Sequence, residues 1–276
     1  MAFLTEPEPP RGAAVPVASG VRRLVARNPG PMTYRGTNTY LLDQPDGVAV
    51  LDPGPDDAAH VADLLREAGQ PIRRILLTHA HRDHLGAVAA LRAATGAPVH
   101  AYRHPAVPGF APGFAPDAAL EDGDEAAGLT ALHTPGHAAD HLCLAAPGGL
   151  VFTGDHVMGW SSSVVNPPGG DMAAYMRGLE RLLARDDRRY LPGHGPPVEE
   201  PRPFVLDLLA HRRAREAALL AALGEAARPL GDFVGLIYPG LDARLLGAAE
   251  RNVLAHLLKL AAEGQAAEGP AGWRRA

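Results

Sequence analysis

The chain has 276 residues, 46% hydrophobic and 21% charged, a composition that excludes a disordered protein and a coiled coil. Its net charge of -5 gives no general reason to expect a nucleic-acid-binding protein. No apolar run is long enough to span a membrane, and the first 20 residues lack the apolar core of a secretory signal. We therefore expect a cytoplasmic protein that makes no contact with membranes.

The proline-rich segment up to Gly20 is expected to be irregular, and after it short apolar runs alternate with amphipathic segments. Strands are predicted at 21–26, 39–42, 48–51, 75–77 and 98–101, then at 129–133, 142–145, 150–152 and 190–191. The turn Gln44-Pro45-Asp46-Gly47 predicts that the second and third of these strands form a hairpin. Helices are predicted at about 58–69, 84–95 and 172–184. Strands that alternate with helices are typical of a layered α/β domain.

The composition changes after a proline-rich break at 195–203. Two Leu/Ala-rich amphipathic helices are predicted at 205–223 and 243–260, with a short apolar segment between them and a small hairpin at the end. This order is typical of a winged-helix unit. The expected organisation is an irregular tail over 1–20, a catalytic domain over 21–200 and a winged-helix-like domain over 201–276. The Leu/Ala stripes suit packing against the catalytic domain or a second subunit, so a homodimer is one expectation.

The strongest chemical signal is a cluster of histidines that directly follows the predicted strand 75–77. Three imidazoles and a carboxylate lie close together there, in Thr78-His79-Ala80-His81-Arg82-Asp83-His84. His and Asp are preferred ligands of zinc and of other divalent ions. A cluster of this kind after a buried strand therefore predicts a metal site.

Four ligands do not saturate two metal ions, and three further ligand-type residues follow later strands. They lie in Thr134-Pro135-Gly136-His137, in Thr153-Gly154-Asp155 and in Leu191-Pro192-Gly193-His194-Gly195. Each of these ligand-type residues follows a glycine, which lets the backbone turn sharply and present the side chain. They complete the set of candidate metal ligands.

These motifs, in this order and at these separations, resemble those of the metallo-β-lactamase superfamily over about residues 20–200. The resemblance implies a four-layered αββα sandwich of class α/β, followed by a small C-terminal winged-helix-like domain. It implies two metal sites, the first made by His79, His81 and His137 and the second by Asp83, His84 and His194. Asp155 is implied to bridge them and Asp52 to support the histidine loop. The implied cofactor is a pair of divalent ions, with zinc as the expected metal.

Longer strings resemble the beta-lactamase-like protein 2 group within that superfamily. They are Gly36-Thr37-Asn38-Thr39-Tyr40-Leu41-Leu42, Gly154-Asp155-His156-Val157-Met158-Gly159-Trp160 and Ala255-His256-Leu257-Leu258-Lys259-Leu260. That group has bacterial members and a mitochondrial member that acts as an endoribonuclease on single-stranded RNA. The resemblance therefore implies RNA as one candidate substrate.

Other branches of the superfamily fit the sequence less well. Asp155 stands where common class B β-lactamases have a cysteine, and only 38 residues separate it from His194, too few for the inserted domain of larger RNA-processing nucleases. His81 stands where diiron flavoproteins have a glutamate. Glyoxalase II shares the core motif and stays open, although residues 159–170 contain no basic residue that would bind glutathione.

The remaining histidines have simpler interpretations. Five of them have no partner cluster and are expected to be structural or exposed: His60, His100, His104, His211 and His256. His141 and His156 lie nearer to the motifs and are candidates for supporting the ligands.

The single cysteine and a run of arginines also have structural interpretations. Cys143 alternates with leucines in a predicted strand and is expected to be a small core residue. Arg212, Arg213 and Arg215 are expected on a solvated helix face. If the substrate is RNA, the same arginines would form an edge that contacts phosphates.

The implied chemistry is hydrolysis by a metal-bound hydroxide, because two ions about 3.5–4 Å apart lower the pKa of a shared water and polarise the scissile group. Asp83 and Asp155 are expected to be the catalytic residues that hold this nucleophile. Four further residues are expected to rim the cleft and hydrogen-bond the substrate: Asn38, Ser161, Ser162 and Ser163.

Three functions stay open. The first is a phosphodiesterase that cuts single-stranded RNA. Residues 201–276 contain ten basic and eight acidic residues, a small excess of positive charge that weakly favours nucleic-acid binding. The second is a hydrolase of small thioesters or lactones similar to glyoxalase II, favoured by the acidic whole chain and the uncharged segment 159–170. The third is a mononuclear-iron persulfide dioxygenase, in which Asp83, His84 and His194 would hold no metal.

Overall fold

The computed structural model describes residues 2–103 and 113–276. Its strands form a seven-stranded sheet in the order β1-β2-β3-β4-β5-β6-β7 and a five-stranded sheet in the order β12-β11-β10-β9-β8. The first sheet contains β1 (Val15–Ala18), β2 (Val21–Val25), β3 (Asn38–Gln44), β4 (Gly47–Leu51), β5 (Ile72–Leu76), β6 (Val99–Tyr102) and β7 (Ala118–Leu120). The second contains β8 (Glu125–Ala126), β9 (Leu129–His133), β10 (Leu142–Ala146), β11 (Leu150–Gly154) and β12 (Arg189–Pro192).

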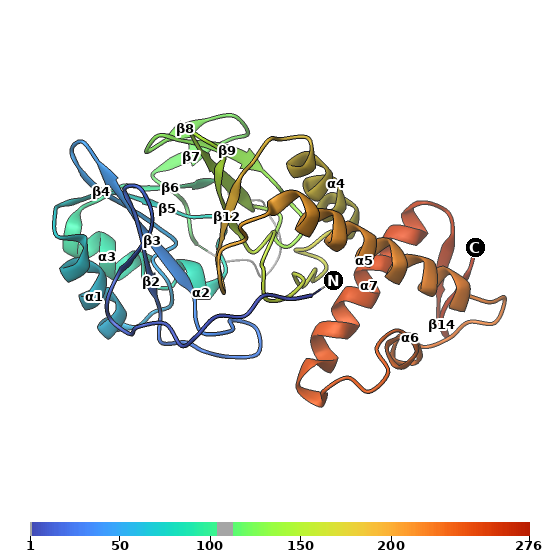
Figure 1. Ribbon diagram of the computed structural model, residues 1–276. Coiled ribbons are helices and arrows are strands. Elements are labelled where there is room, and N and C mark those ends of the chain that lie inside the picture. Colours follow the sequence, from blue (N-terminus) through green and yellow to red (C-terminus); the bar gives the residue numbers. More distant parts are fainter. Residues whose placement is uncertain (1, 104–112) are drawn as a thin grey trace.

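Helices cover the outer faces of the two sheets (Figure 1). They are α1 (Ala58–Ala68), α2 (Arg82–Leu85) and α3 (Val88–Thr95) beside the first sheet, and α4 (Met172–Leu183) and α5 (Pro201–Ala222) beside the second. The facing sides of the sheets share an apolar cluster that includes Leu76 and Phe152. Separate clusters join α1 and α3 to the first sheet and join α4 and α5 to the second. This arrangement is the layered α/β architecture that the sequence predicts.

Local signals in the sequence define several element ends. The predicted hairpin is present, since β3 and β4 pair antiparallel with Gln44 opposite Gly47. Asp57 caps α1 by accepting a hydrogen bond from the backbone N–H of Ala59 at 2.8 Å. Gly69 ends the same helix with a φ of 66°, a left-handed conformation that favours glycine.

Two local predictions are wrong. The segment up to Gly20 is not wholly irregular, because Val15–Ala18 forms the edge strand β1 and pairs with β2. The helix expected over 84–95 is instead two helices, α2 and α3, which meet near Gly86. A Cβ atom at Gly86 would collide with the backbone of Asp56, so the break in the helix lets the chain pass close to the loop that follows β4.

The C-terminal part of the chain builds a core of its own. Beyond α5 it contains α6 (Leu230–Ile237), the 3-10 helix η1 (Ala243–Leu245), α7 (Leu246–Ala262) and a hairpin of β13 (Ala266–Gly269) and β14 (Gly272–Arg275). Phe233, Leu257 and Trp273 are buried together there. Helix α5 contributes to two cores, since Leu208 packs with the cluster around α4 whereas Leu219 packs with α6 and α7. The Leu/Ala stripes are thus covered within the chain, and a homodimer stays a prediction.

Cys143 is fully buried in β10, as the sequence predicts. Its Sγ accepts a hydrogen bond from Thr134 Oγ1 at 3.3 Å. Burial raises the pKa of the thiol to about 12, so Cys143 is not an activated nucleophile. Within the described residues, no helix combines the length and the apolar character that crossing a membrane requires.

Candidate metal centre

The predicted ligands converge in space although they come from four separate loops. These loops follow β5, β9, β11 and β12. The side chains that they bring together are His79, His81, Asp83, His84, His137, Asp155 and His194. A strand end followed by a short turn fixes each side chain on a rigid support.

The first group consists of His79, His81 and His137. His81 Nδ1 lies 2.9 Å from His79 Nε2 and 2.9 Å from His137 Nε2. Three ring nitrogens that point at one another form the His₃ set that is common at catalytic zinc sites.

The second group consists of Asp83, His84 and His194. Asp83 Oδ2 lies 3.1 Å from His194 Nε2 and 3.6 Å from His84 Nε2. The side chain of Asp83 is 30% exposed whereas both imidazoles are buried, so this group faces solvent through its carboxylate.

Asp155 lies between the two groups. Its Oδ2 is 3.5 Å from His137 Nε2 in the first group. Its Oδ1 is 3.5 Å from His84 Nε2 and 3.5 Å from His194 Nε2 in the second. One carboxylate oxygen facing each group is the arrangement that a bridging ligand needs.

Buried atoms without hydrogen-bond partners indicate that the site fits metal ions. Nε2 of His84, Nε2 of His194 and Oδ1 of Asp155 are buried and make no hydrogen bond to the described residues. A buried polar atom is costly unless something binds it. The ligand atoms of each group lie within 4.8 Å of one another, and imidazole with carboxylate is a donor set that suits zinc and similar divalent ions.

Asp52 supports the histidine loop. It accepts hydrogen bonds from the backbone N–H of Thr78 at 2.8 Å and from Thr78 Oγ1 at 2.7 Å. Its Oδ2 also lies 2.9 Å from His84 Nδ1, which leaves His84 Nε2 directed at the site. Asp140, which sequence analysis missed, accepts a hydrogen bond from the backbone N–H of Ala80 at 2.9 Å. Its position between His137 and His141 was the available signal.

His137 and Asp155 are held from outside the site. His137 Nδ1 donates to the backbone carbonyl of Val164 at 2.7 Å, so Nε2 is left to face the site. His141 Nε2 accepts a hydrogen bond from the backbone N–H of Asp155 at 3.1 Å. His141 therefore holds the backbone of Asp155 and does not join the ligand groups.

Two of the four predicted substrate contacts are wrong. Asn38 is fully buried, and its Nδ2 donates to two backbone carbonyls of the loop around His194, at 2.8 and 2.9 Å. Ser163 is also buried, and its Oγ donates to the backbone carbonyl of Asp155. Both side chains are occupied in holding ligand-bearing loops, so neither reaches a substrate.

The other histidines lie outside the ligand groups. Besides His141, those that the structure describes are His60, His100, His133, His156, His211 and His256. His60 is buried with its Nε2 3.1 Å from Thr39 Oγ1, and burial lowers its pKa to about 4. His104 lies outside the described residues.

The expectation that Arg212, Arg213 and Arg215 share a solvated helix face is wrong, and so is the phosphate-contacting edge that they would form for RNA. Arg212 is fully buried and donates to a backbone carbonyl of the catalytic domain. Arg215 donates to the backbone carbonyl of Ile237 at 2.6 Å. Arg213 has a side chain that is 61% exposed, but it pairs with Glu180 at 2.8 Å. The three guanidinium groups thus do not form a common surface for phosphates.

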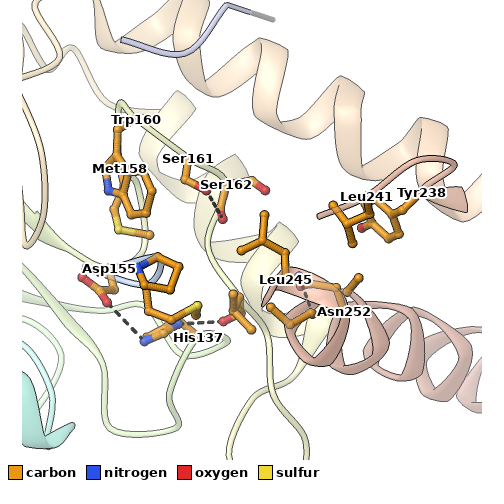
Figure 2. Close-up of a pocket in the computed structure, with 15 residues that line it drawn as sticks. His137, Asp155, Met158, Trp160, Ser161, Ser162, Tyr238, Leu241, Leu245 and Asn252 are labelled. Carbon is orange, nitrogen blue, oxygen red and sulfur yellow. Dashed lines mark hydrogen bonds and ion pairs between the residues drawn. The ribbon is translucent and has the colours of Figure 1, made fainter. Parts of the chain in front are cut away.

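A cavity of about 140 Å³ lies between the metal-ligand groups and the C-terminal helices. Figure 2 shows its walls, with Met158 and Trp160 on one side and Tyr238, Leu241 and Leu245 on the other. His137 and Asp155 line its end, and Ser161 and Ser162 lie between the walls (Figure 2). No arginine or lysine of the described chain lines this cavity.

The two groups differ in protonation. Burial lowers the pKa of His79, His81 and His137, to about 3 for His81, so these imidazoles are neutral at pH 7. Burial also opposes the charge of His194, but the Asp155 and Asp83 carboxylates outweigh it and raise the pKa of His194 to about 9. The protonated His194 in turn holds the pKa of Asp155 well below its usual range, against the effect of burial.

Metal affinity should therefore rise with pH between about 7 and 9. His194 must release its proton before its Nε2 can bind a metal ion, so the apparent dissociation constant for zinc should fall about tenfold per pH unit for each proton released. Calorimetric titration of zinc into chelator-treated protein, in buffers of different ionisation enthalpy, counts those protons. An affinity that stays flat over this range would contradict the assignment of His194.

The metal-free protein should show the opposite trend in stability. A raised folded-state pKa contributes stability below the unfolded-state value of about 6.5, and this contribution is lost as pH rises through the folded-state pKa of about 9. The free energy of unfolding of the metal-free protein should thus decrease between pH 7 and 9.5, as urea titrations would measure.

Comparison with known proteins identifies two regions. The Metallo-beta-lactamase superfamily model matches residues 32–194, and the Beta-lactamase associated winged helix domain matches residues 230–273. The Beta-lactamase-like protein 2 homolog of Drosophila melanogaster is 34% identical over 273 residues, which cover 92% of this chain and 91% of the relative. The atrochrysone carboxyl ACP thioesterase of Passalora fulva is 32% identical over 261 residues, which cover 89% of this chain and 76% of the relative.

A solved structure shows the same architecture. A metallo-beta-lactamase family protein of Thermus thermophilus superposes with a TM-score of 0.79 at 26% identity, covering 94% of this chain and 99% of the other. This coverage extends over both regions, so the predicted fold class is confirmed. The chain belongs to the metallo-beta-lactamase superfamily and carries a beta-lactamase-associated winged helix domain.

Proposed function

We propose that this member of a superfamily of hydrolases is a dinuclear metal-dependent enzyme that hydrolyses small acyl thioesters. The observation that carries the proposal is the apolar cavity that ends at His137 and Asp155. An uncharged acyl group would fit such a cavity, whereas a polyanion would find no cation among the described residues that line it. Its volume of about 140 Å³ is below the ~300–1,000 Å³ of sites for drug-sized ligands, which favours an acyl chain smaller than such ligands.

The proposed metals are two zinc ions. The first group and the second group described above would hold one ion each, with Asp155 shared. When bound, the ions would supply Lewis-acid activation of water and of the scissile carbonyl.

The residues of the chain would orient the reactants. The 30% exposed carboxylate of Asp83 is positioned to accept a hydrogen bond from a water that enters the site. The buried carboxylate of Asp155 faces the end of the cavity, where the scissile bond would lie. Met158, Trp160 and Leu245 exclude water from the acyl chain.

One of the relatives supports this substrate class. The Passalora fulva protein is named as a thioesterase that acts on an acyl chain held by a carrier protein. The arginines that would have supported RNA binding are buried or paired. RNA cleavage therefore becomes an outcome of the test.

The test is a substrate screen with zinc-loaded protein. The probes are uncharged N-acetylcysteamine thioesters of acetate, butyrate and octanoate, a simple lactone and a single-stranded RNA oligonucleotide. We expect metal-dependent thioester hydrolysis, with kcat/KM rising about fourfold per methylene that enters the cavity, since each buried methylene contributes about 0.8 kcal/mol. Chelation should abolish the activity.

Two results would overturn the proposal. Metal-dependent cleavage of the RNA without thioester hydrolysis would establish a nuclease. One equivalent of iron in protein purified without chelator, together with oxygen consumption on a persulfide, would establish the dioxygenase.

A further inference from the structure

A short segment lies beside the candidate metal ligands and contacts two of them. We call residues 161–165 the strap. The strap's Val164 carbonyl accepts the hydrogen bond from His137 Nδ1 at 2.7 Å. The Oγ of Ser163 donates to the backbone carbonyl of Asp155 and to that of His156, the latter at 3.2 Å. The strap therefore fixes the ring of His137 and the backbone that carries Asp155.

The C-terminal helices hold the other side of the strap. Arg212, on α5, donates through Nη2 to the backbone carbonyl of Ser163. Asn252, on α7, accepts a hydrogen bond from the backbone N–H of Val165 at 3.0 Å. Arg212 Nη1 donates to the same Oδ1 of Asn252 at 3.3 Å, and Asn252 Nδ2 donates to the backbone carbonyl of Ala248 at 3.2 Å. Two helices and the strap are thus joined by one connected set of hydrogen bonds.

The burial of Arg212 argues for a specific role. Its side chain has no exposed surface, and it forms no ion pair with a carboxylate of the described residues. Its guanidinium lies 5.0 Å from the ring centre of Tyr175 and otherwise binds neutral oxygen atoms. Burying a charge in this way is costly, and an apolar side chain would pack there more cheaply. The neighbouring Arg213 shows that α5 has an exposed face for a guanidinium.

We propose that Arg212 and Asn252 are positioning residues for the metal centre, acting through the strap on His137 and Asp155. This inference rests on the proposed metal site, and it makes the winged helix domain part of that site's support. Residues that orient metal ligands typically change metal affinity about 10–100-fold when they are removed. Hydrogen bonds lead from α5 and α7 through the strap to His137. Arg212 and Asn252 therefore help to orient a ligand of the first group.

The test compares metal binding by matched variants. Asn252→Ala removes the oxygen acceptor that holds Val165, whereas Asn252→Asp retains an oxygen acceptor at the same place. Arg212→Gln removes the buried guanidinium, and Arg213→Gln is the control because it removes an exposed one on the same helix. Zinc dissociation constants are measured by competition with a chromophoric chelator, and the geometry of the centre is read from the visible spectrum of the cobalt-substituted protein.

We expect Asn252→Ala and Arg212→Gln to weaken the binding of at least one zinc ion tenfold or more and to shift the cobalt spectrum. Asn252→Asp should restore affinity to within about threefold of the unchanged protein, and Arg213→Gln should have no effect. Hydrogen exchange on the metal-free protein gives a second readout, since the strap should exchange faster in Asn252→Ala and not in Arg213→Gln. If Arg212→Gln does not fold, the Asn252 pair decides the question.

Two contrary outcomes are distinguishable. Folded Asn252→Ala that keeps the affinity, cobalt spectrum and exchange of the unchanged protein would overturn the role of the strap while the proposed function stands. Failure of the unchanged protein to bind any metal would overturn the proposed function and this inference together.

Discussion

Replacement of Asp155 by asparagine is expected to lower kcat/KM for thioester hydrolysis by about a thousandfold, equivalent to about 4 kcal/mol. The two carboxylate oxygens of Asp155 lie 3.5 Å from His137 Nε2 and 3.5 Å from His84 and His194 Nε2. An asparagine has one carbonyl oxygen, so it cannot serve both groups, and its NH₂ would face ring nitrogens. Steady-state kinetics and metal analysis of the purified variant would measure the loss, with metal content falling below two equivalents.

Asp122→Asn is the matched control for this experiment. Asp122 is an exposed carboxylate that pairs with Arg181 at 2.6 Å on the surface, and such pairs contribute little to stability. The control should retain kcat/KM within about twofold. An Asp155→Asn variant that hydrolyses thioesters at the rate of the unchanged protein with one metal bound would exclude the bridging role.

Leu245→Lys is expected to change which acyl chains the enzyme accepts. Leu245 lines the cavity opposite Trp160, so a lysine there would place an ammonium group against apolar walls and remove contact area for the chain. We expect kcat/KM for the octanoyl thioester to fall about a hundredfold, from lost burial of several methylenes at about 0.8 kcal/mol each. The acetyl thioester is too short to depend on this wall and should lose less than about threefold.

The neighbouring Leu246→Lys provides the control. Leu246 is 44% exposed and does not line the cavity, so the same substitution there leaves the acyl site unchanged. The ratio of octanoyl to acetyl kcat/KM should stay at the value of the unchanged protein. Equal losses for both thioesters in Leu245→Lys would show that the cavity does not bind the acyl chain.

The convergence of the candidate ligands could be predicted because its signals are local. Each candidate ligand follows a short apolar strand and sits in a motif that includes a glycine or a second histidine, so neighbours in sequence indicate its position. Asp140 shows that such local signals do not reveal residues that support the ligands from a distant part of the sequence. It lies between His137 and His141, yet its contact with the backbone of Ala80 joins segments 60 residues apart.

The substrate side of the site could not be predicted in the same way, because burial depends on how distant elements pack. Arg212, Arg213 and Arg215 form a basic run, but helix geometry directs them to three different environments. Asn38 and Ser163 are polar and close to the motifs, as substrate contacts would be. Both side chains instead donate hydrogen bonds to backbone carbonyls. The walls of the cavity come from both regions of the chain, so no contiguous stretch of residues indicates its apolar character.

Helix α5 has a consequence for the way the two regions can be separated. Its 22 residues begin in the core beneath α4 and end in the core around Phe233 without a break. Because one continuous helix belongs to both cores, unfolding of one core would also disrupt the other. The two regions should therefore melt in a single transition. A chain cut before Pro201 would leave the apolar side of α4 open to water, and such a fragment should aggregate. The winged helix domain therefore cannot be exchanged between relatives by joining the two regions at a linker. A chimera of two relatives would need its junction within α5, or it would have to replace both cores together.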